Sequence, residues 1–198
     1  IQAEENLGFT GGNIRGLASA GGRYLVLLNP DTEAAPDWLA AMVETMETYP
    51  EAGIGAAKLI AYDSKRIDSA GDGCTVTGRG FKRGDKQRAS DYDRTEYVFG
   101  ACGGAMMIRR SLIEEIGFLD NDFFLIYEDV DYCFRAQLAG HKCIYCANAI
   151  VYHKVRSSIQ EMSDLAVYYS LRNAKWLLWK NMPGALLWKY MGQHILQE

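Results

Sequence analysis

"GRYLVLLNPDT", residues 22–32, is the clearest indication of the fold, because it holds an apolar run typical of a buried parallel strand, stopped by Pro30 and Asp31. A strand that ends in an acid places Asp31 at the carboxyl edge of a sheet, where open α/β folds bind ligands. With Asn29 beside it, this carboxylate suits a hard divalent cation that bridges phosphate oxygens. The alternative is an Asn-Pro-Asp-Thr turn in which Asp31 only caps a loop.

Strands and helices alternate along the rest of the chain, which predicts an α/β fold with a mainly parallel central sheet flanked by helices and a C-terminal helical tail. Residues 1–160 are expected to form one domain, and residues 161–198 an amphipathic helical segment. The segments that carry this pattern are a helix over 36–50, a strand over 54–60, an excursion of loops and short strands over 62–92, a strand with a glycine break over 96–110, a helix over 127–139 and two strands over 142–154.

The composition limits the classes of protein that fit. A chain of 198 residues with 48% hydrophobic residues suits one globular domain. A net charge of −4 and a pI near 5.5 argue against a nucleic-acid partner, which needs a concentrated basic surface. Five cysteines in a chain of this size favour a reducing compartment over a disulfide framework. No apolar run is long enough to span a bilayer.

A group of acids begins the helix in "FFLIYEDVDYCFRAQLAG", residues 123–140. Glu128 and Asp129 fall in its first turn, where the helix dipole stabilises an ionised carboxylate that can act as a base. Asp131 and Arg135 are four apart and are expected to form a salt bridge. The alternative is that all three acids form the solvated first turn of an ordinary helix.

Three further features have a functional and a structural interpretation. Gly11 and Gly12, ahead of a helix expected over 13–20, could bring backbone N–H groups to a diphosphate, or could mark a turn. His153 ends a strand, where it is either a satisfied structural residue or, if Asp31 holds a cation, a further ligand in a mixed set that suits manganese. The segment 165–197 has no acid but several basic and aromatic residues, which suits an anionic membrane surface or packing on the domain.

The order of these motifs resembles the family 2 inverting glycosyltransferases of the GT-A fold, and most closely a bacterial rhamnosyltransferase-like branch. The motifs that carry the resemblance are "NLGFTGGN", "GRYLVLLNPDT", "VFGACGGAMMIRR", "GFLDNDFFLIYEDVDYCFRAQLAGHK", "VYH" and "YYSLRN", spread over nearly the whole chain. The resemblance implies an enzyme that transfers a sugar from a nucleotide-diphosphate donor to a glycan or lipid-linked acceptor with inversion, in cell-surface polysaccharide synthesis. It implies a cytoplasmic protein, peripheral on the inner face of the cell membrane.

The resemblance also implies roles for single residues. Asp31 and His153 would hold the divalent cation, Mn²⁺ or Mg²⁺, although the family's first motif acid is here Asn29. Asp129 would be the catalytic base with Glu128 in support. The donor-binding residues would be Asn6, Gly8, Gly11, Gly12, Asn29, Gly103 and Gly104.

Family members usually start with a strand and loops that bind the nucleobase, ahead of "NLGF". The chain therefore resembles a truncated domain, which we expect to bind nucleotide poorly by itself. Two other functions fit less well. One is a non-catalytic relative that serves as a binding or scaffold module, and the other is a metal-dependent phosphate-ester hydrolase, which needs more ligands than Asp31, Asp129 and His153 provide.

Overall fold

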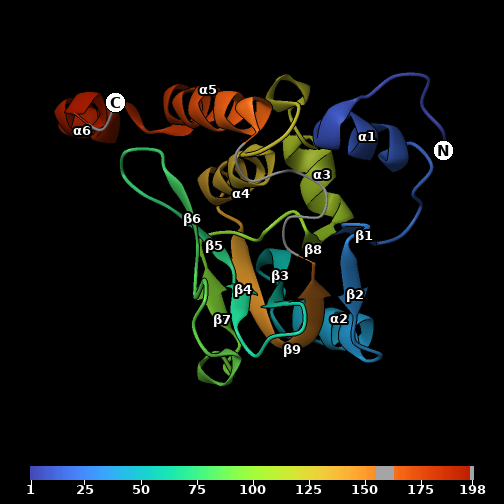
Figure 1. Cartoon of the computed structure of the whole chain (residues 1–198). Coiled ribbons are helices and arrows are strands. Elements are labelled where there is room, and N and C mark those ends of the chain that lie inside the picture. Colours follow the sequence, from blue (N-terminus) through green and yellow to red (C-terminus); the bar gives the residue numbers. More distant parts are fainter. Residues whose placement is uncertain (155–162, 197–198) are drawn as a thin grey trace.

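The computed structural model describes residues 1–154 and 163–196, and Figure 1 shows a central sheet with helices on both sides. The boundary expected between residues 160 and 161 lies outside the described residues. In chain order the elements are α1 (Gly8–Leu17), β1 (Tyr24–Leu28), β2 (Thr32–Ala34), α2 (Trp38–Thr48), β3 (Ala52–Ala61), β4 (Ile67–Ser69), β5 (Asp72–Cys74), β6 (Gly80–Lys82), η1 (Ala89–Asp91), β7 (Glu96–Val98), β8 (Ala105–Arg109), α3 (Arg110–Ile116), η2 (Asn121–Phe123), α4 (Glu128–Leu138), β9 (Lys142–His153), α5 (Asp164–Asn181) and α6 (Gly184–Leu196).

The main sheet has the strand order β1-β8-β3-β9-β2, with β4 joined to β3 and β7 to β9. Only the β3–β9 pairing among these described strands is parallel, so the expectation of a mainly parallel sheet is wrong. The alternation of strand and helix does give β1 and β3 the same direction, since both pair antiparallel with β8. The prediction failed because β8, from much later in the chain, lies between them in the opposite direction.

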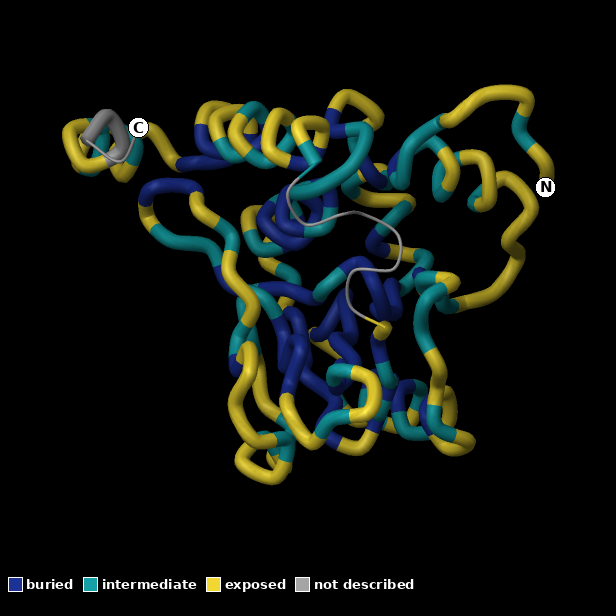
Figure 2. The backbone as a smooth tube through the Cα atoms, viewed as in Figure 1, coloured by how far each residue is buried: buried dark blue, intermediate teal, exposed yellow. Residues whose placement is uncertain are grey.

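The strand over residues 24–28 is likewise not a buried parallel strand. It is the edge strand β1, and its residues alternate between more and less buried positions. The long buried strand is β3, whose residues 52–60 are all buried at the centre of the sheet (Figure 2). The segment 142–154 forms one long strand, β9, with a register shift against β3, rather than two.

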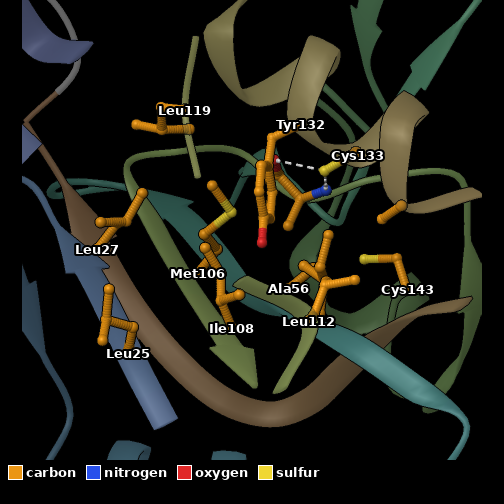
Figure 3. Packing of buried hydrophobic residues seen from close by; sticks show 13 residues of the cluster. Leu25, Leu27, Ala56, Met106, Ile108, Leu112, Leu119, Tyr132, Cys133 and Cys143 are labelled. Atoms are coloured by element: carbon orange, nitrogen blue, oxygen red, sulfur yellow. Dashed lines mark hydrogen bonds between the residues drawn. The ribbon is translucent and has the colours of Figure 1, made fainter. Parts of the chain in front are cut away.

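Alternation along the strands divides the core between the two faces of the sheet. On one face, Met107 of β8 packs with Met42 and Met46 of α2. On the other, Met106 and Ile108 of the same strand pack with α3 and α4, in the cluster shown in Figure 3. Burying a side chain of this size contributes about 1.5–3 kcal/mol relative to leaving it exposed. The sheet is therefore fixed between α2 and the layer that carries the acids of α4.

The C-terminal helix α5 forms an outer layer on α4 (Figure 1). Leu177, Leu178 and Met182 pack against Val130 and Phe134 of α4. None of the helices that the structure describes combines the length and the apolar character needed to cross a membrane.

The predicted ion pair between Asp131 and Arg135 is confirmed, with 2.8 Å between Oδ2 and Nε. Asp131 is fully buried, so the alternative of a solvated first turn is wrong for this acid. Its other oxygen accepts from Asn181 Nδ2 of α5 at 2.8 Å and lies 2.9 Å from Lys180 Nζ. Asp131 therefore joins α4 to α5 as well as closing its own helix turn.

Candidate active site

A cavity of about 430 Å³ lies at the start of α4. It brings together residues that are far apart in the sequence, including five expected at a site. The lining residues are Phe9, Asn29, Asp72, Gly80, Phe81, Lys82, Cys102, Gly103, Gly104, Leu125, Ile126, Tyr127, Glu128, Asp129 and Val130.

Asp129 lies in the first turn of α4, as predicted, and its carboxylate is held by two backbone donors. Gly103 N–H donates to Oδ2 and Val130 N–H donates to Oδ1, each at 2.8 Å. Burial raises the pKa of Asp129, although these N–H groups and the Lys82 ammonium act to lower it. A carboxylate of raised pKa that lines a cavity is suited to accept a proton from a bound molecule.

Glu128, beside it, is only 6% exposed, so it too is not part of a solvated turn. Its Oε2 atom is buried and has no hydrogen-bond partner among the described residues. Burial, and then the negative charge of Asp129, raise the pKa of Glu128 well above its ordinary value. The helix dipole therefore does not keep Glu128 ionised, because desolvation outweighs it.

The loop over residues 124–127 that leads into α4 is strained. Phe124, Ile126 and Tyr127 have φ angles of 61°, 67° and 75°, in the left-handed region. Such conformations cost about 1–3 kcal/mol each and persist only where the surrounding structure holds them. The side chain of Tyr127 is fixed as well, because its hydroxyl accepts from Gly80 N–H at 3.1 Å.

Asn173 of α5 holds this loop from one side, and we refer to its contacts as the Asn173 clamp. Its Nδ2 lies 3.0, 2.9 and 2.6 Å from the carbonyl oxygens of Phe123, Leu125 and Ile126. Asn173 is fully buried and donates to the Leu125 and Ile126 carbonyls in place of bulk water, while the Phe123 carbonyl also accepts from Leu125 N–H and Arg172. The part of the tail that "YYSLRN" occupies thus positions the acids of α4.

Helix α1 holds the loop from the other side. Thr10 N–H donates to the Phe124 carbonyl at 3.0 Å. Gly8 has a φ of +66°, and a Cβ added there would lie 2.5 Å from the Phe124 oxygen, so only glycine fits.

The glycine cluster is arranged differently from the expectation. Helix α1 begins at Gly8, so Gly11 and Gly12 lie inside the helix rather than ahead of it. Gly11 N–H donates to the Leu7 carbonyl at 3.2 Å and is not presented to a ligand. The expectation failed because Asn6, which accepts from Gly8 N–H at 3.0 Å, starts the helix earlier. Asn6, Gly8 and Gly12 line a separate cavity of about 380 Å³, together with Arg15.

The segment over residues 29–32 forms the turn named as the structural alternative, since Thr32 N–H donates to the Asn29 carbonyl at 3.2 Å. The turn nevertheless brings Asp31 to His153, because Thr32 in β2 pairs with His153 in β9. Asp31 Oδ1 and His153 Nε2 are 3.4 Å apart. The other ring nitrogen, Nδ1, lies 2.8 Å from Asp68 Oδ2.

Asp68 determines which ring nitrogen of His153 faces Asp31. Burial raises the pKa of Asp68, but its bonds to His153 and Lys82 outweigh this and lower the pKa below its ordinary value. An ionised Asp68 only accepts hydrogen bonds, so Nδ1 donates to it and Nε2 is the ring nitrogen that faces Asp31. Two ligand atoms about 3.4 Å apart match the spacing around a cation with bonds of roughly 2.1 Å. The carboxylate behind the histidine is the usual support of such a ligand.

Lys82 connects this pair to the cavity of Asp129. Its Nζ donates to Asp68 Oδ1 at 2.8 Å, and Lys82 lines the cavity. Burial acts to lower the pKa of Lys82, but the carboxylates of Asp68 and Asp72 raise it, so the ammonium stays charged. Asp31 and His153 are not among the residues that line the cavity of Asp129; Lys82, which does line it, contacts Asp68 behind His153.

Asp68, Asp72 and Lys82 were missed at the level of sequence. All three come from the excursion over residues 62–92, which was interpreted as polar loops. A signal was present in "IDSAGDGC", where two acids four apart interrupt small and apolar residues. Acids in such a run are rarely buried unless they have a role.

Gly103 leaves little space between Asp129 and α1, and Gly103→Ala is expected to lower activity at least tenfold. An added Cβ would lie 3.2 Å from Phe9 Cζ and 3.3 Å from Asp129 Cβ, so the carboxylate must shift. A displacement of about 1 Å at a reacting group can cost about a hundredfold, so the smaller shift needed here is expected to cost about tenfold. Initial rates of the variant would be compared with Gly192→Ala in α6, where an added Cβ meets no atom within 4 Å. Equal rates for both variants would contradict the prediction.

Comparison with known proteins places this chain among the glycosyltransferases. The sequence model of glycosyl transferase family group 2 matches residues 24–196. The low-salt glycan biosynthesis hexosyltransferase Agl10 of Haloferax volcanii is 24% identical over 87% of this chain and 57% of its own. An N-acetylglucosaminyl-diphospho-decaprenol L-rhamnosyltransferase of Mycobacterium tuberculosis is 25% identical over 74% of this chain and 52% of its own. The chain therefore spans about half the length of these relatives.

Two solved structures show the same fold at low sequence identity. GalNAc-T7, determined with UDP, GalNAc and Mn²⁺, matches with a TM-score of 0.67 at 16% identity, over 88% of this chain and 36% of its own. The mannosyltransferase PcManGT of Pyrobaculum calidifontis, determined with GDP-Man and Mn²⁺, matches with a TM-score of 0.55 at 15% identity, over 97% of this chain and 57% of its own. The predicted GT-A fold is confirmed by this likeness.

Proposed function

The chain belongs to glycosyl transferase family group 2, and on that basis we propose that it transfers a sugar from a nucleotide-diphosphate donor to a hydroxyl of a glycan or lipid-linked acceptor, with inversion. The observation that carries the proposal is the placement of Asp129. Its carboxylate is fixed by Gly103 and Val130, has a raised pKa and lines a cavity. The Haloferax volcanii relative, whose name refers to glycan biosynthesis, supports a role in surface polysaccharide synthesis.

The proposed mechanism needs a single base. A sugar hydroxyl is a poor nucleophile at neutral pH, and Asp129 accepts its proton during attack on the anomeric carbon. Attack from the face opposite the leaving diphosphate inverts that carbon in one step, so no second carboxylate is needed as a nucleophile. Gly103 and Gly104 leave room for the reacting sugars. Asn29 is a polar neighbour of Gly104, because its Nδ2 lies 3.6 Å from a Cβ built on that glycine.

Asp31 and His153 are the residues that would hold a divalent cation, Mn²⁺ or Mg²⁺. When bound, such an ion offsets negative charge on the departing diphosphate. The spacing of the two ligand atoms and the Asp68 carboxylate behind His153 support this assignment. Lys82 adds a fixed positive charge on the cavity side of the pair.

We assign the nucleotide end of the donor to the cavity lined by Asn6, Gly8 and Gly12. Arg15 in the same lining supplies a cation for a phosphate. Gly11, whose N–H group bonds within the helix, would act only by its small size.

The experiment that tests the function is a donor panel with the intact protein. Nucleoside diphosphate release and glycan product would be measured with UDP-, GDP- and dTDP-sugars, with Mn²⁺, with Mg²⁺ and with EDTA. Metal-dependent transfer with an inverted product is the expected result. A protein that binds donor or glycan but transfers no sugar would support the alternative, a binding or scaffold module.

Asp68→Asn is expected to weaken Mn²⁺ binding by 10- to 100-fold, because the amide no longer fixes the His153 ring as an ionised carboxylate does. Binding would be followed by the loss of the free Mn²⁺ signal in electron paramagnetic resonance, which does not depend on turnover. The matched control is Asp37→Asn, an exposed acid at the start of α2. Unchanged affinity in Asp68→Asn would remove His153 from the proposed metal site.

We further propose that the outer side of α5 and α6 rests on an anionic membrane surface. Leu171, Trp179 and Trp188 are exposed there, although Arg172 and Lys180 bind the domain instead. Trp179→Ala with Trp188→Ala is expected to reduce co-sedimentation with phosphatidylglycerol-containing vesicles at least fivefold, as buried aromatic area drives interfacial binding. Leu39→Ala, at an exposed apolar position on α2, is the control. Equal sedimentation of all variants, or none by the wild type, would oppose the proposal.

A further inference from the structure

A third carboxylate faces the proposed base from a different part of the chain. Asp72, Asp129 and Cys102 each offer an atom that lies within 4.8 Å of the other two. All three line the same cavity. Asp72 is the first residue of β5, so the two acids meet only in the folded protein.

Asp72 is held on both sides of its strand. In the small β5–β6 sheet it lies directly opposite Lys82. On the other side, Asp72 N–H donates to the Gly100 carbonyl at 2.8 Å and Gly100 N–H donates to the Asp72 carbonyl at 3.0 Å. Its side-chain Oδ1 accepts from Ser69 Oγ at 2.6 Å. A carboxylate fixed in this way cannot turn away from Asp129 without breaking these contacts.

The other ionisable groups around Asp129 do not supply a second negative charge beside it. In Glu128 of α4, burial and then the charge of Asp129 raise the pKa well above its ordinary value, which disfavours a second negative charge there. Burial also raises the pKa of the Cys102 thiol well above its ordinary value, so it stays protonated. Lys82 is positive, and its hydrogen bond goes to Asp68. Asp72 is thus the nearby acid whose charge can act on Asp129.

We propose that Asp72 is a positioning residue for the base: the two carboxylates act as a pair, and the charge of Asp72 makes Asp129 take up the acceptor proton more strongly. The inference rests on the proposed function, in which Asp129 is the base. Like charges at this separation favour binding of one proton between them. Burial and then the charge of Asp129 raise the pKa of Asp72 to about 7, so above that pH Asp72 is ionised and its charge faces Asp129.

The step that Asp72 assists is balanced without a further reactant. The O–H bond of the acceptor breaks and its proton goes to Asp129, while the acceptor oxygen forms a bond to the anomeric carbon. The bond from that carbon to the donor phosphate oxygen breaks, and its electron pair leaves on the nucleoside diphosphate. Asp72 contacts neither sugar in this step and acts only through Asp129.

The test is Asp72→Asn in the intact protein, because the amide keeps the acceptor for Ser69 and the shape of the side chain. We expect the acid limb of the pH profile of kcat/KM to move to lower pH by about one unit, since a single carboxylate loses its like-charged neighbour. The plateau of kcat should fall about tenfold, with KM for the donor unchanged. Asp91→Asn, an exposed acid of the same excursion, is the control.

A lower plateau with an unmoved acid limb would show a merely structural role and overturn the proposal. A direct titration separates this result from failure of the proposed function. In ¹³C NMR of the labelled carboxyl groups, the midpoint of Asp129 should fall in Asp72→Asn whether or not any sugar is transferred. An Asp129 midpoint that stays in place would refute the pair even in an active enzyme.

Discussion

Asp129→Asn lowers kcat for sugar transfer by about a thousandfold, while KM for the donor changes little, if Asp129 is the base. General base catalysis contributes about 10²- to 10⁴-fold, and the amide cannot accept the acceptor proton. The amide oxygen still accepts one of the two backbone N–H groups that the carboxylate holds, so the cavity is kept. The measurement is a set of initial rates with varied donor at saturating acceptor.

The matched control for this variant is Asp122→Asn. Asp122 is an exposed acid of η2, seven positions before Asp129 in the sequence. The Asp122→Asn variant should transfer sugar at the rate of the wild type. Full activity of Asp129→Asn would sink the assigned base. An equal loss in both variants would mean that disturbing the loop, rather than losing a base, lowers the rate.

Asn173→Ala is expected to lower the free energy of unfolding by about 3 kcal/mol, and to reduce kcat of the molecules that remain folded. The substitution removes the donor to the Leu125 and Ile126 carbonyls of the strained loop, whereas the Phe123 carbonyl keeps Leu125 N–H and Arg172 as donors. Leaving buried acceptors without a donor costs about 1–3 kcal/mol, and the left-handed residues then lose part of what holds them. Urea unfolding gives the first quantity, and rates at a temperature where the variant is folded give the second.

A second buried asparagine on the same helix separates the two effects. Asn181 donates to Asp131 at 2.8 Å and does not contact the loop over 124–127 through any bond that the structure describes. Asn181→Ala should therefore be destabilised by about 1–2 kcal/mol but keep its activity when folded. If Asn173→Ala is as stable as the wild type, the clamp does not hold the loop. If both variants lose activity equally, general loosening of α5 explains the effect.

Much of the fold could be predicted because its signals are local. The apolar run of β1, the spacing of Met42 and Met46 in α2, and the ion pair of Asp131 with Arg135 all depend on neighbours within a few residues. The direction of β8 could not be predicted, because strand pairing across a long sequence separation leaves no local signal. For the same reason the long strand β9 was divided into two.

The candidate site was predictable in part. The resemblance named Asp31, Asp129 and His153, and the structure joins Asp31 directly to His153 and places Asp129 in a cavity. It gave no indication of Asp68 or Asp72, because their roles arise from contacts with β9 and α4 that a loop sequence does not encode. Residues that act through a partner are visible only when the partner is in place.

The Asn173 clamp also orders the events of synthesis. The strands of the main sheet are all contained in the chain up to His153, and α5 follows them. A nascent chain that has emerged up to His153 therefore holds every strand of the main sheet, while the loop before α4 still lacks the Asn173 donor that holds its left-handed residues. In a chain stalled before α5, we expect the strands of the main sheet to be able to pair while the acids of α4 are not yet positioned for catalysis.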